Sequence, residues 1–406
     1  MPTKTSFPKP ILTRALATAL LALPSLNAFP ATGDFLSPYV AVSTRYDDNL
    51  FRLPDGTDTE LLLGESHRSD WRRTAAAGLG IDWQPGRQQV SAKLEASDHA
   101  FDRFDFLDYT GFDTNARWQM AAGRRFTGEV RGSYTRSLNT FEDFRIPRKD
   151  LLDVGLFDLD VGYLITPDIE FTGGAGVASR KHDLNSQRES NLRSRYWLVS
   201  VSQRTPLGNR LGLEYRHDTG DYPNRDFTSV SVVDDGYQQQ SVSVTGSWRG
   251  AFTQLGGSLG YARRDFDHLG ERDYSGLVGE LRLNYMYSPK LTLGLQGYRR
   301  LQSLDDLLSS SVIETGVAFD ASWAFSDRLS LALRSEFRDR EFQDSGLFAG
   351  ASQPKERLYA HVVSVSYTPR TFLTLTAAVD QGQRNSDRDG FDYDYMGVVF
   401  LVQLNF

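Results

Sequence analysis

The sequence predicts an all-β protein: a transmembrane antiparallel up-and-down β-barrel of about 18 strands, with about 16 as the other possibility. Three observations predict this fold class. Apolar and polar residues alternate along the chain, short turns alternate with longer connections, and aromatic residues lie beside the short turns. The composition agrees, because the 406 residues include 35 Gly, 18 Tyr and 25 Phe but only 4 Met. Aromatic side chains are favoured in β-strands.

The first 28 residues have the pattern of a secretory signal peptide. Basic residues up to Arg14 precede the apolar run 15–23, and a small-residue cleavage site ends at Ala28. The apolar run is about half of the ~20 residues that a membrane-spanning helix needs. The sequence therefore predicts a signal peptide over 1–28. It predicts an outer-membrane β-barrel over 29–406, with short periplasmic turns and longer extracellular loops, in a Gram-negative bacterium.

The alternation has a period of two residues, as expected for strands with one apolar and one wet face. It is clear at 126–135, 277–287 and 329–338, where one face carries Leu, Phe and Tyr and the other carries Arg and Glu. In the strand predicted near 151–166 the parity slips beside Phe157, which indicates a β-bulge or an error of register. The polar faces are too charged to form a packed core.

The predicted connections fall into two classes. Tight turns such as Pro85-Gly86-Arg87 and Ser288-Pro289-Lys290 alternate with longer, acidic connections such as 139–149. This asymmetry is typical of outer-membrane barrels. Amphipathic aromatic side chains prefer the membrane interface, so those near the tight turns predict a girdle. The predicted girdle comprises Trp83, Trp118, Tyr163, Trp248, Tyr287, Trp323, Phe325 and Tyr367.

The chain ends in VVFLVQLNF, an apolar stripe that finishes on an aromatic residue. This resembles the C-terminal signature by which the barrel assembly machinery recognises outer-membrane proteins. The predicted assembly signal comprises Val398, Phe400, Val402, Leu404 and Phe406.

A barrel of about 16 to 18 strands leaves an aqueous lumen, so the polar faces predict a hydrophilic channel wall. Acidic and basic residues neighbour one another on it, and structural ion pairs explain any single pair better than a binding site does. Taken together they favour polar cargo. The predicted pore-lining residues are Lys93, Glu95, Asp113, Arg117, Glu129, Arg131, Asp158, Asp160, Glu214, Arg216, Glu280, Arg282, Asp320, Arg334, Glu336 and Arg338.

Other functions find little support in the sequence. The net charge of −7 and the pI of about 5.5 exclude nucleic acid as a partner. Six His residues show no metal-site spacing, and the adjacent Ser97, Asp98 and His99 establish no catalytic geometry. We expect no enzymatic activity, no cofactor and no metal. The absence of Cys excludes disulfides.

The segment YDDNLFRLPDG, residues 46–56, marks the end of the first predicted strand and the start of an outer loop. It lacks the spaced ligands of a calcium loop, so its acids read as turn residues. With the signal peptide, the all-β chain and the aromatic C-terminus, it resembles the EpsL family of outer-membrane proteins encoded with exopolysaccharide and exosortase systems. That resemblance implies a barrel that takes part in exopolysaccharide biosynthesis or export, with separate periplasmic polysaccharide-export proteins as partners.

Two alternatives stay open. One is a general or solute-specific diffusion porin for small hydrophilic solutes. Such pores commonly fold a long loop inward, and because the longest candidates, 53–69 and 222–236, are modest, the sequence favours an open conduit. The other is a structural anchor for surface glycan, in which acidic clusters such as Asp234-Asp235 and Asp305-Asp306 bind divalent ions between phosphates of lipopolysaccharide and other outer-membrane lipid.

Overall fold

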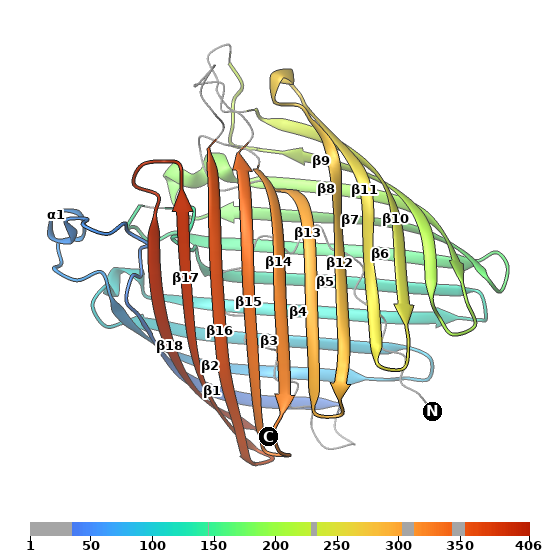
Figure 1. The fold of residues 1–406 in the computed structure, drawn as a ribbon, viewed down its shortest axis with the longest axis horizontal. Coiled ribbons are helices and arrows are strands. Elements are labelled where there is room, and N and C mark those ends of the chain that lie inside the picture. The colour runs from blue at the N-terminus through green and yellow to red at the C-terminus, as the bar shows by residue number, and fades with distance from the viewer. Residues whose placement is uncertain (1–34, 145, 229–233, 303–311, 343–353) are drawn as a thin grey trace.

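The chain folds into a closed barrel. The computed structural model describes residues 35–144, 146–228, 234–302, 312–342 and 354–406. Within these residues 18 antiparallel strands form one sheet, in which neighbours in sequence pair (Figure 1). Pairing of β1 with β18, from Tyr39 with Asn405 to Asp47 with Gly397, closes the ring. The predicted fold class is confirmed. The predicted signal peptide and the pair Asp305-Asp306 lie outside the described residues.

The strand bounds follow the predicted hairpins. The first nine strands are β1 (Leu36–Asp47), β2 (Asp70–Trp83), β3 (Gln89–Phe101), β4 (Tyr109–Ala122), β5 (Phe126–Leu138), β6 (Leu151–Leu164), β7 (Ile169–His182), β8 (Leu192–Arg204) and β9 (Arg210–Asp221). The others are β10 (Gly236–Arg249), β11 (Thr253–Phe266), β12 (Tyr274–Ser288), β13 (Leu291–Gln302), β14 (Val312–Ala324), β15 (Leu329–Phe342), β16 (Lys355–Arg370), β17 (Leu373–Ser386) and β18 (Tyr393–Asn405).

Short helices occur in the connections at one end of the barrel. They are α1 (Thr59–Leu63), η2 (Asp105–Leu107), η3 (Asn185–Ser190) and η4 (Gly270–Arg272). In the described part of the chain, no helix has the length and apolar character needed to cross a membrane.

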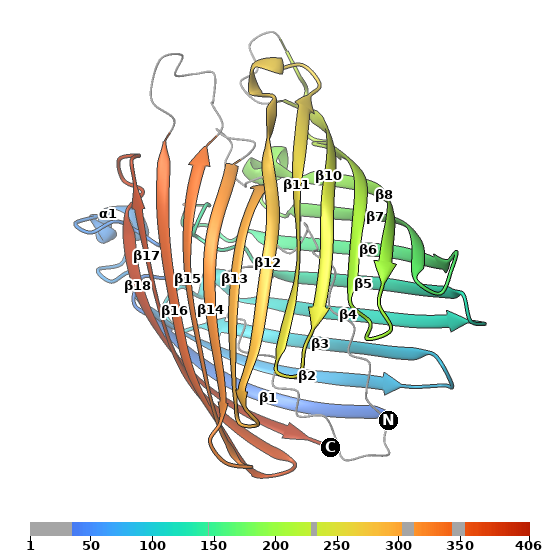
Figure 2. The ribbon, with the colours of Figure 1, turned by 45° about the vertical axis from the view of Figure 1, so that its right-hand side comes forward.

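The two ends of the barrel differ as predicted. One end carries tight turns, which lie toward the right and bottom of Figure 1, and the longer connections gather at the other end (Figures 1 and 2). Gly86 and Gly123 adopt φ of +65° and +60° in two of these turns, a region that favours glycine. The tight turns are 84–88, 123–125, 165–168, 205–209, 250–252, 289–290, 325–328 and 371–372. We call the end with the longer connections the outer end.

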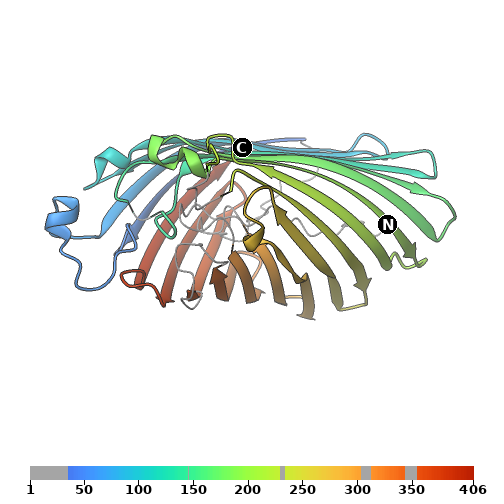
Figure 3. The ribbon, with the colours of Figure 1, turned by 90° about the horizontal axis from the view of Figure 1, so that it is seen from above.

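The faces of the strands are reversed relative to a soluble protein. On β6, Phe157 is 51% exposed whereas the adjacent Asp158 is 1% exposed. Apolar side chains therefore face outward and charged side chains face inward, which is the pattern of a barrel in lipid. The protein lies in the outer membrane of a Gram-negative bacterium. From above, β1–β9 run along one wall and the later strands along the other (Figure 3).

The predicted irregularity in β6 is wrong. β5 and β6 pair without a register shift from Phe126 with Tyr163 to Leu138 with Leu151. The alternation of inward and outward faces continues along β6. Only the residue types change, because near the outer end the outward face extends beyond the apolar band of the barrel. There the outward Asp153 accepts a hydrogen bond of 2.9 Å from the Tyr134 hydroxyl.

The aromatic girdle is present beside the tight turns. Trp83 is 52% exposed, Trp248 48% and Tyr287 67%, as expected for amphipathic rings at an interface. The C-terminal stripe also faces outward, with Phe400 51% exposed. Its recognition by the assembly machinery stays a prediction.

Inward-facing tyrosines brace neighbouring strands. A Cβ placed on Gly78 would lie 2.3 Å from Cζ of Tyr39, and one on Gly316 would lie 2.3 Å from Cζ of Tyr298. Only glycine leaves room for a ring to lie flat across the adjacent strand. The hydroxyl of Tyr298 thereby reaches Glu336, to which it donates a hydrogen bond of 2.8 Å.

Candidate functional site: a loop across the outer end of the lumen

The connection between β5 and β6, residues 139–150, reaches strands far around the ring. Glu142 Oε1 lies 3.1 Å from Arg338 Nη1 and 2.9 Å from Arg340 Nη2, both on β15. Asp143 Oδ1 lies 3.0 Å from Arg340 Nη1. Arg384 Nη1 on β17 donates to the Glu142 carbonyl at 2.6 Å. Because these arginines face inward, the connection crosses the outer end of the lumen. We call it the crossing loop.

The arginines that receive the crossing loop are themselves held by carboxylates. Arg340 Nε lies 2.9 Å from Glu314 Oε2, and Arg300 Nη2 lies 2.7 Å from Glu314 Oε1. Arg384 is paired in the same way with Glu356 of β16. We call Arg300, Arg338, Arg340, Arg384, Glu314 and Glu356 the carboxylate-paired wall. Alternating charges at this spacing fix the position of each guanidinium independently of the crossing loop.

The electrostatics of the loop follow from this wall. Burial raises the pKa of Glu142, but the charges of Arg338, Arg340 and Arg384 outweigh burial and hold that pKa at about 2. Burial also raises the pKa of Asp143, and there the arginines do not compensate fully. Glu142 therefore stays ionised in this contact.

Apolar residues hold the other side of the crossing loop. Phe141 and Phe144 are 4% and 2% exposed and belong to a cluster with Phe51 and Leu53 of the β1–β2 connection and Phe104 of the β3–β4 connection. The Phe51 ring lies 4.7 Å from Phe141 and 4.8 Å from Phe104, both edge-to-face. Edge-to-face pairs are the favoured geometry of aromatic rings. We call this group the loop core.

The segment YDDNLFRLPDG forms the base of the loop core. Asp47 Oδ1 lies 2.8 Å from Arg52 Nη1 and accepts the backbone N–H of Asn49 at 3.1 Å. The buried Asn49 donates from Nδ2 to the carbonyls of Leu53 and Asp394, each at 2.8 Å. The side chain of Asn49 is thus committed to the turn itself and to β18, and that of Asp47 to Arg52 and to Arg45 of β1. The expectation of turn residues rather than metal ligands agrees with these contacts.

A second group of inward arginines has different partners. Arg180 Nη2 donates to the Ser190 carbonyl at 3.3 Å, and Arg264 Nε donates to Gln239 Oε1 at 3.0 Å. Arg225 donates to the carbonyls of Glu189 at 2.7 Å and Asp234 at 2.8 Å. Burial lowers the pKa of Arg225, and the charges of Arg180 and Arg272 lower it further. We call Arg225 and Arg264 the amide-paired wall.

The predicted pore-lining residues lie on the inward-facing positions of their strands, and several form cross-strand pairs. Arg117 Nη2 lies 2.7 Å from Glu129 Oε2. Arg334 Nη1 lies 2.8 Å from Asp320 Oδ1. Further contacts are Lys93–Glu95 at 3.0 Å, Arg131–Asp160 at 3.2 Å, Arg131–Asp158 at 3.7 Å and Arg334–Glu336 at 3.2 Å.

Sequence reasoning missed Glu142, Asp143, Arg340 and Arg384. Strand alternation could have predicted Arg340, because Arg340 continues the inward series Arg334, Glu336 and Arg338 by one more step of two residues. Glu142 carried no such signal, since it lies between strands where no periodicity applies.

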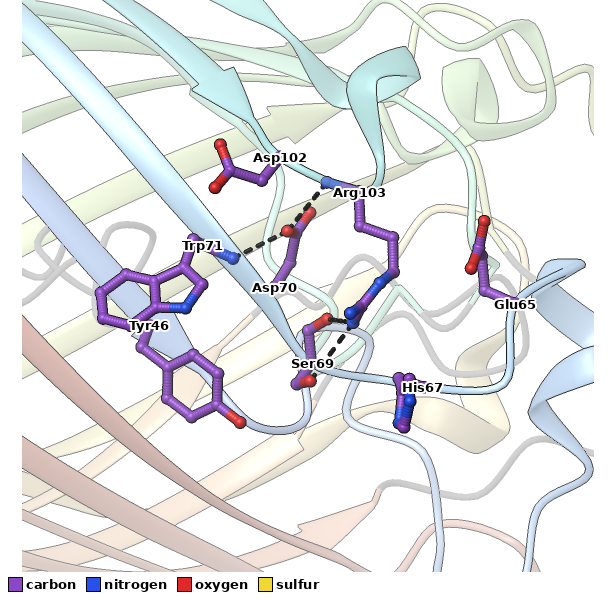
Figure 4. A pocket seen from close by; sticks show the side chains of 8 residues that line it. All are labelled: Tyr46, Glu65, His67, Ser69, Asp70, Trp71, Asp102 and Arg103. Carbon is purple, nitrogen blue, oxygen red and sulfur yellow. Dashed lines mark hydrogen bonds between the residues drawn. The ribbon is translucent and has the colours of Figure 1, made fainter.

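A pocket of about 740 Å³ opens at the outer rim beside the start of β2 (Figure 4). The Tyr46 and Trp71 rings lie on one side of it, 5.2 Å apart, on outward-facing positions. The Asp70 carboxylate accepts the backbone N–H of Trp71 at 2.7 Å and of Arg103 at 3.0 Å. The pocket therefore lies outside the lumen, and its central acid stabilises the strand end.

The side chains of Ser97, Asp98 and His99 form no reactive arrangement. His99 contacts Ser97 Oγ at 2.9 Å, but Asp98 lies on the opposite face, where Thr110 Oγ1 donates to it at 3.4 Å. The Ser97, Asp98 and His99 triad is thus broken by strand alternation.

At the outer rim, ligand atoms of Asp234, Asp235 and His268 come within 4.8 Å of one another. Asp234 Oδ2 already accepts the N–H groups of His268 and Leu269, at 2.8 and 2.7 Å. That carboxylate serves the connection between β11 and β12, and the grouping is not assigned a metal.

Comparisons with known proteins find a family-model match over part of the chain and a likeness of fold over most of it. The model of a family described as "Putative beta-barrel porin 2" matches residues 242–406, from within β10 through β18. The comparison with curated proteins finds no match. The EpsL resemblance finds no support, and the YDDNLFRLPDG segment on which it rested lies outside the matched residues.

Similar solved structures include two from Pseudomonas aeruginosa and one from Acinetobacter baumannii. OccK2 (OpdF) of Pseudomonas aeruginosa is 10% identical with a TM-score of 0.50, covering 91% of this chain and 97% of that one. OccK1 (OpdK) of the same organism is 12% identical, TM-score 0.47, covering 91% and 99%. OccAB3 of Acinetobacter baumannii is 11% identical, TM-score 0.47, covering 91% and 99%. At these identities the likeness is one of fold.

Proposed function

We propose that the barrel is a diffusion porin for small hydrophilic solutes and that the crossing loop narrows its lumen. The observation that carries the proposal is the contact of Glu142 and Asp143 with Arg338 and Arg340, which fixes a loop across the outer end. The sixteen inward residues named from the sequence line the wall that a solute would pass. Their mixed charge suits water-soluble cargo.

The crossing loop weighs against polysaccharide export. A hydrated polymer needs a continuous wide path, whereas a loop tied to both sides of the lumen divides it. The expectation of an open conduit rested on the lengths of 53–69 and 222–236, and the loop that crosses is neither of these. Its contacts, rather than its length, favour the diffusion porin.

Electrical recording tests the proposal. The purified barrel in planar bilayers is compared with a variant in which residues 140–149 are replaced by a short Gly-Ser link. We expect discrete conductance steps for the wild type and larger steps for the variant. A matched control shortens 267–273, whose contacts described above lie with Asp234 and Asp235, and should leave the step size unchanged.

Two outcomes would contradict the proposal. Absence of conductance from the folded wild-type barrel would favour a structural anchor. Equal steps from the wild type and the 140–149 variant would mean that the crossing loop does not limit the path. Uptake of small sugars by liposomes that contain each barrel gives a second readout of the same comparison.

A further inference from the structure

The loop core links the crossing loop to the seam of the barrel, where β1 and β18 pair. Phe51 is 1% exposed and lies at the centre of this core, with Phe104 and Phe141 packed edge-to-face against it. Phe141 and Phe144 flank Glu142 and Asp143 in sequence. The crossing loop therefore presents alternate sides to two supports, an aromatic one at Phe51 and an ionic one at the carboxylate-paired wall.

The Phe51 support is itself fixed to the barrel. Asn49, which is 0% exposed, ties the turn to the Asp394 carbonyl of β18. Asp48 adds two backbone links to Met396 of β18, one through its N–H at 3.1 Å and one through its carboxylate at 2.8 Å. Arg52 adopts φ of +55° and lies 3.6 Å over the Tyr395 ring. Strain of this kind persists only where surrounding contacts enforce it.

The two supports differ in how precisely each can fix the position of the crossing loop. Ion pairs set which side chains meet, but long Arg and Glu side chains tolerate shifts of the backbone. Close-packed aromatic rings tolerate little displacement, because a small gap forfeits much of the dispersion contact. The height and angle at which the crossing loop spans the lumen are therefore set by the aromatic side.

We propose that Phe51 is the positioning residue of the pore: through Phe141 it sets where the crossing loop lies, and so sets the width of the channel. This inference rests on the proposed function. It assigns the YDDNLFR segment a role in permeation without contact with the solute.

Single-channel recording of Phe51→Ala tests the inference. We expect a severalfold rise in conductance, toward that of the barrel with residues 140–149 replaced. Phe51→Leu, which keeps most of the apolar volume, should retain most of the wild-type value. The matched control is Phe266→Ala, because Phe266 is 7% exposed in a separate cluster with Leu192, Tyr222 and Tyr237. It should leave conductance unchanged.

The loop-replaced background separates positioning from a general loss of structure. In that background Phe51→Ala should change nothing further, because the loop that it positions is gone. An equal rise with and without the loop would overturn the inference, since Phe51 would then act on the barrel seam. So would an unchanged conductance for Phe51→Ala beside a raised one for the loop-replaced barrel.

Failure of the proposed function looks different. In that case replacement of 140–149 leaves the steps of the wild type unaltered, whatever Phe51 does. If Phe51→Ala does not fold, Phe141→Ala probes the same contact from the loop side and should raise conductance in the same way. A wild-type value for a folded Phe141→Ala barrel would overturn the inference.

Discussion

The carboxylate-paired wall and the amide-paired wall line the same lumen and use arginine for different ends. On the first, Arg340 lies within 3.0 Å of oxygens from Glu142, Asp143 and Glu314. On the second, Arg225 and Arg264 are held by neutral carbonyl and amide oxygens. Pairing with carboxylates neutralises the positive electric field of a guanidinium and fixes the position of the group. A guanidinium held by neutral acceptors keeps its charge.

Both walls keep buried guanidinium nitrogens without a hydrogen-bond partner among the described residues. They are Arg225 Nη2 and Arg264 Nη1 on the amide-paired wall, and Arg300 Nε and Arg384 Nε on the carboxylate-paired wall. Buried donors without partners are uncommon and ask for an explanation. The comparison teaches that the two walls differ in the acceptors that hold their arginines, and that the carboxylate-paired wall also holds a loop across the outer end.

The sharpest way to break the comparison is to remove one arginine from each wall. Arg340→Ala removes a guanidinium that Glu142, Asp143 and Glu314 all contact, and we expect a loss of about 3–5 kcal/mol, the usual cost of breaking a buried ion pair. Arg225→Ala leaves neutral oxygens, and about 1–3 kcal/mol is expected. Urea unfolding in detergent micelles, followed by Trp fluorescence, measures both. Equal losses would show that the two walls do not differ in kind.

Ion selectivity sharpens the comparison further. Arg264→Gln removes a charge that no carboxylate described here neutralises, so the reversal potential in a salt gradient should shift toward cations. Arg300→Gln on the carboxylate-paired wall is the matched control. It removes a charge that Glu314 balances locally, and its larger effect should be on unfolding. A shift of equal size for both variants would contradict an uneven field.

Which residues line the lumen wall was largely predictable from the sequence, because the alternation of faces along a strand is a local property. Arg334, Glu336 and Arg338 occupy every second position between Leu333 and Asp339, and each takes the inward face that this alternation predicts. The same reasoning failed at β6, where the outward face continues past the apolar band to Asp153. Periodicity shows which residues share a face, and it does not show where the membrane ends.

The crossing loop was not predictable in the same way. Glu142 and Arg340 are 198 positions apart in sequence, and no periodicity joins a connection to a distant strand. The role of Phe51 was hidden for a related reason. The acidic residues around it suggested a turn or a metal loop, whereas its function in the fold depends on Phe141, which lies in another connection.

Of these changes, mild acid should have the smallest effect on the difference between the two walls. The folded-state pKa of Glu142 is about 2, below its usual value of 4.5, so its ion pairs contribute fully above 4.5 and are lost as the pH falls toward 2. Asp143 titrates in the opposite sense, because its raised pKa means that protonation relieves a buried charge. The other ionisable groups that act on Glu142 are Arg338, Arg340, Arg384, Tyr393 and Tyr395.

Conductance should therefore stay constant from pH 7 to pH 5 and rise only as the pH falls from about 4.5 toward 2, between the ordinary pKa of a Glu and that of Glu142. Glu142→Gln should remove that rise, because the group that titrates is gone, and should give a larger conductance at every pH. The amide-paired wall offers the control, since Arg264→Gln should leave the pH profile unchanged. A rise already complete at pH 5, or one that persists in Glu142→Gln, would mean that another carboxylate holds the crossing loop in place.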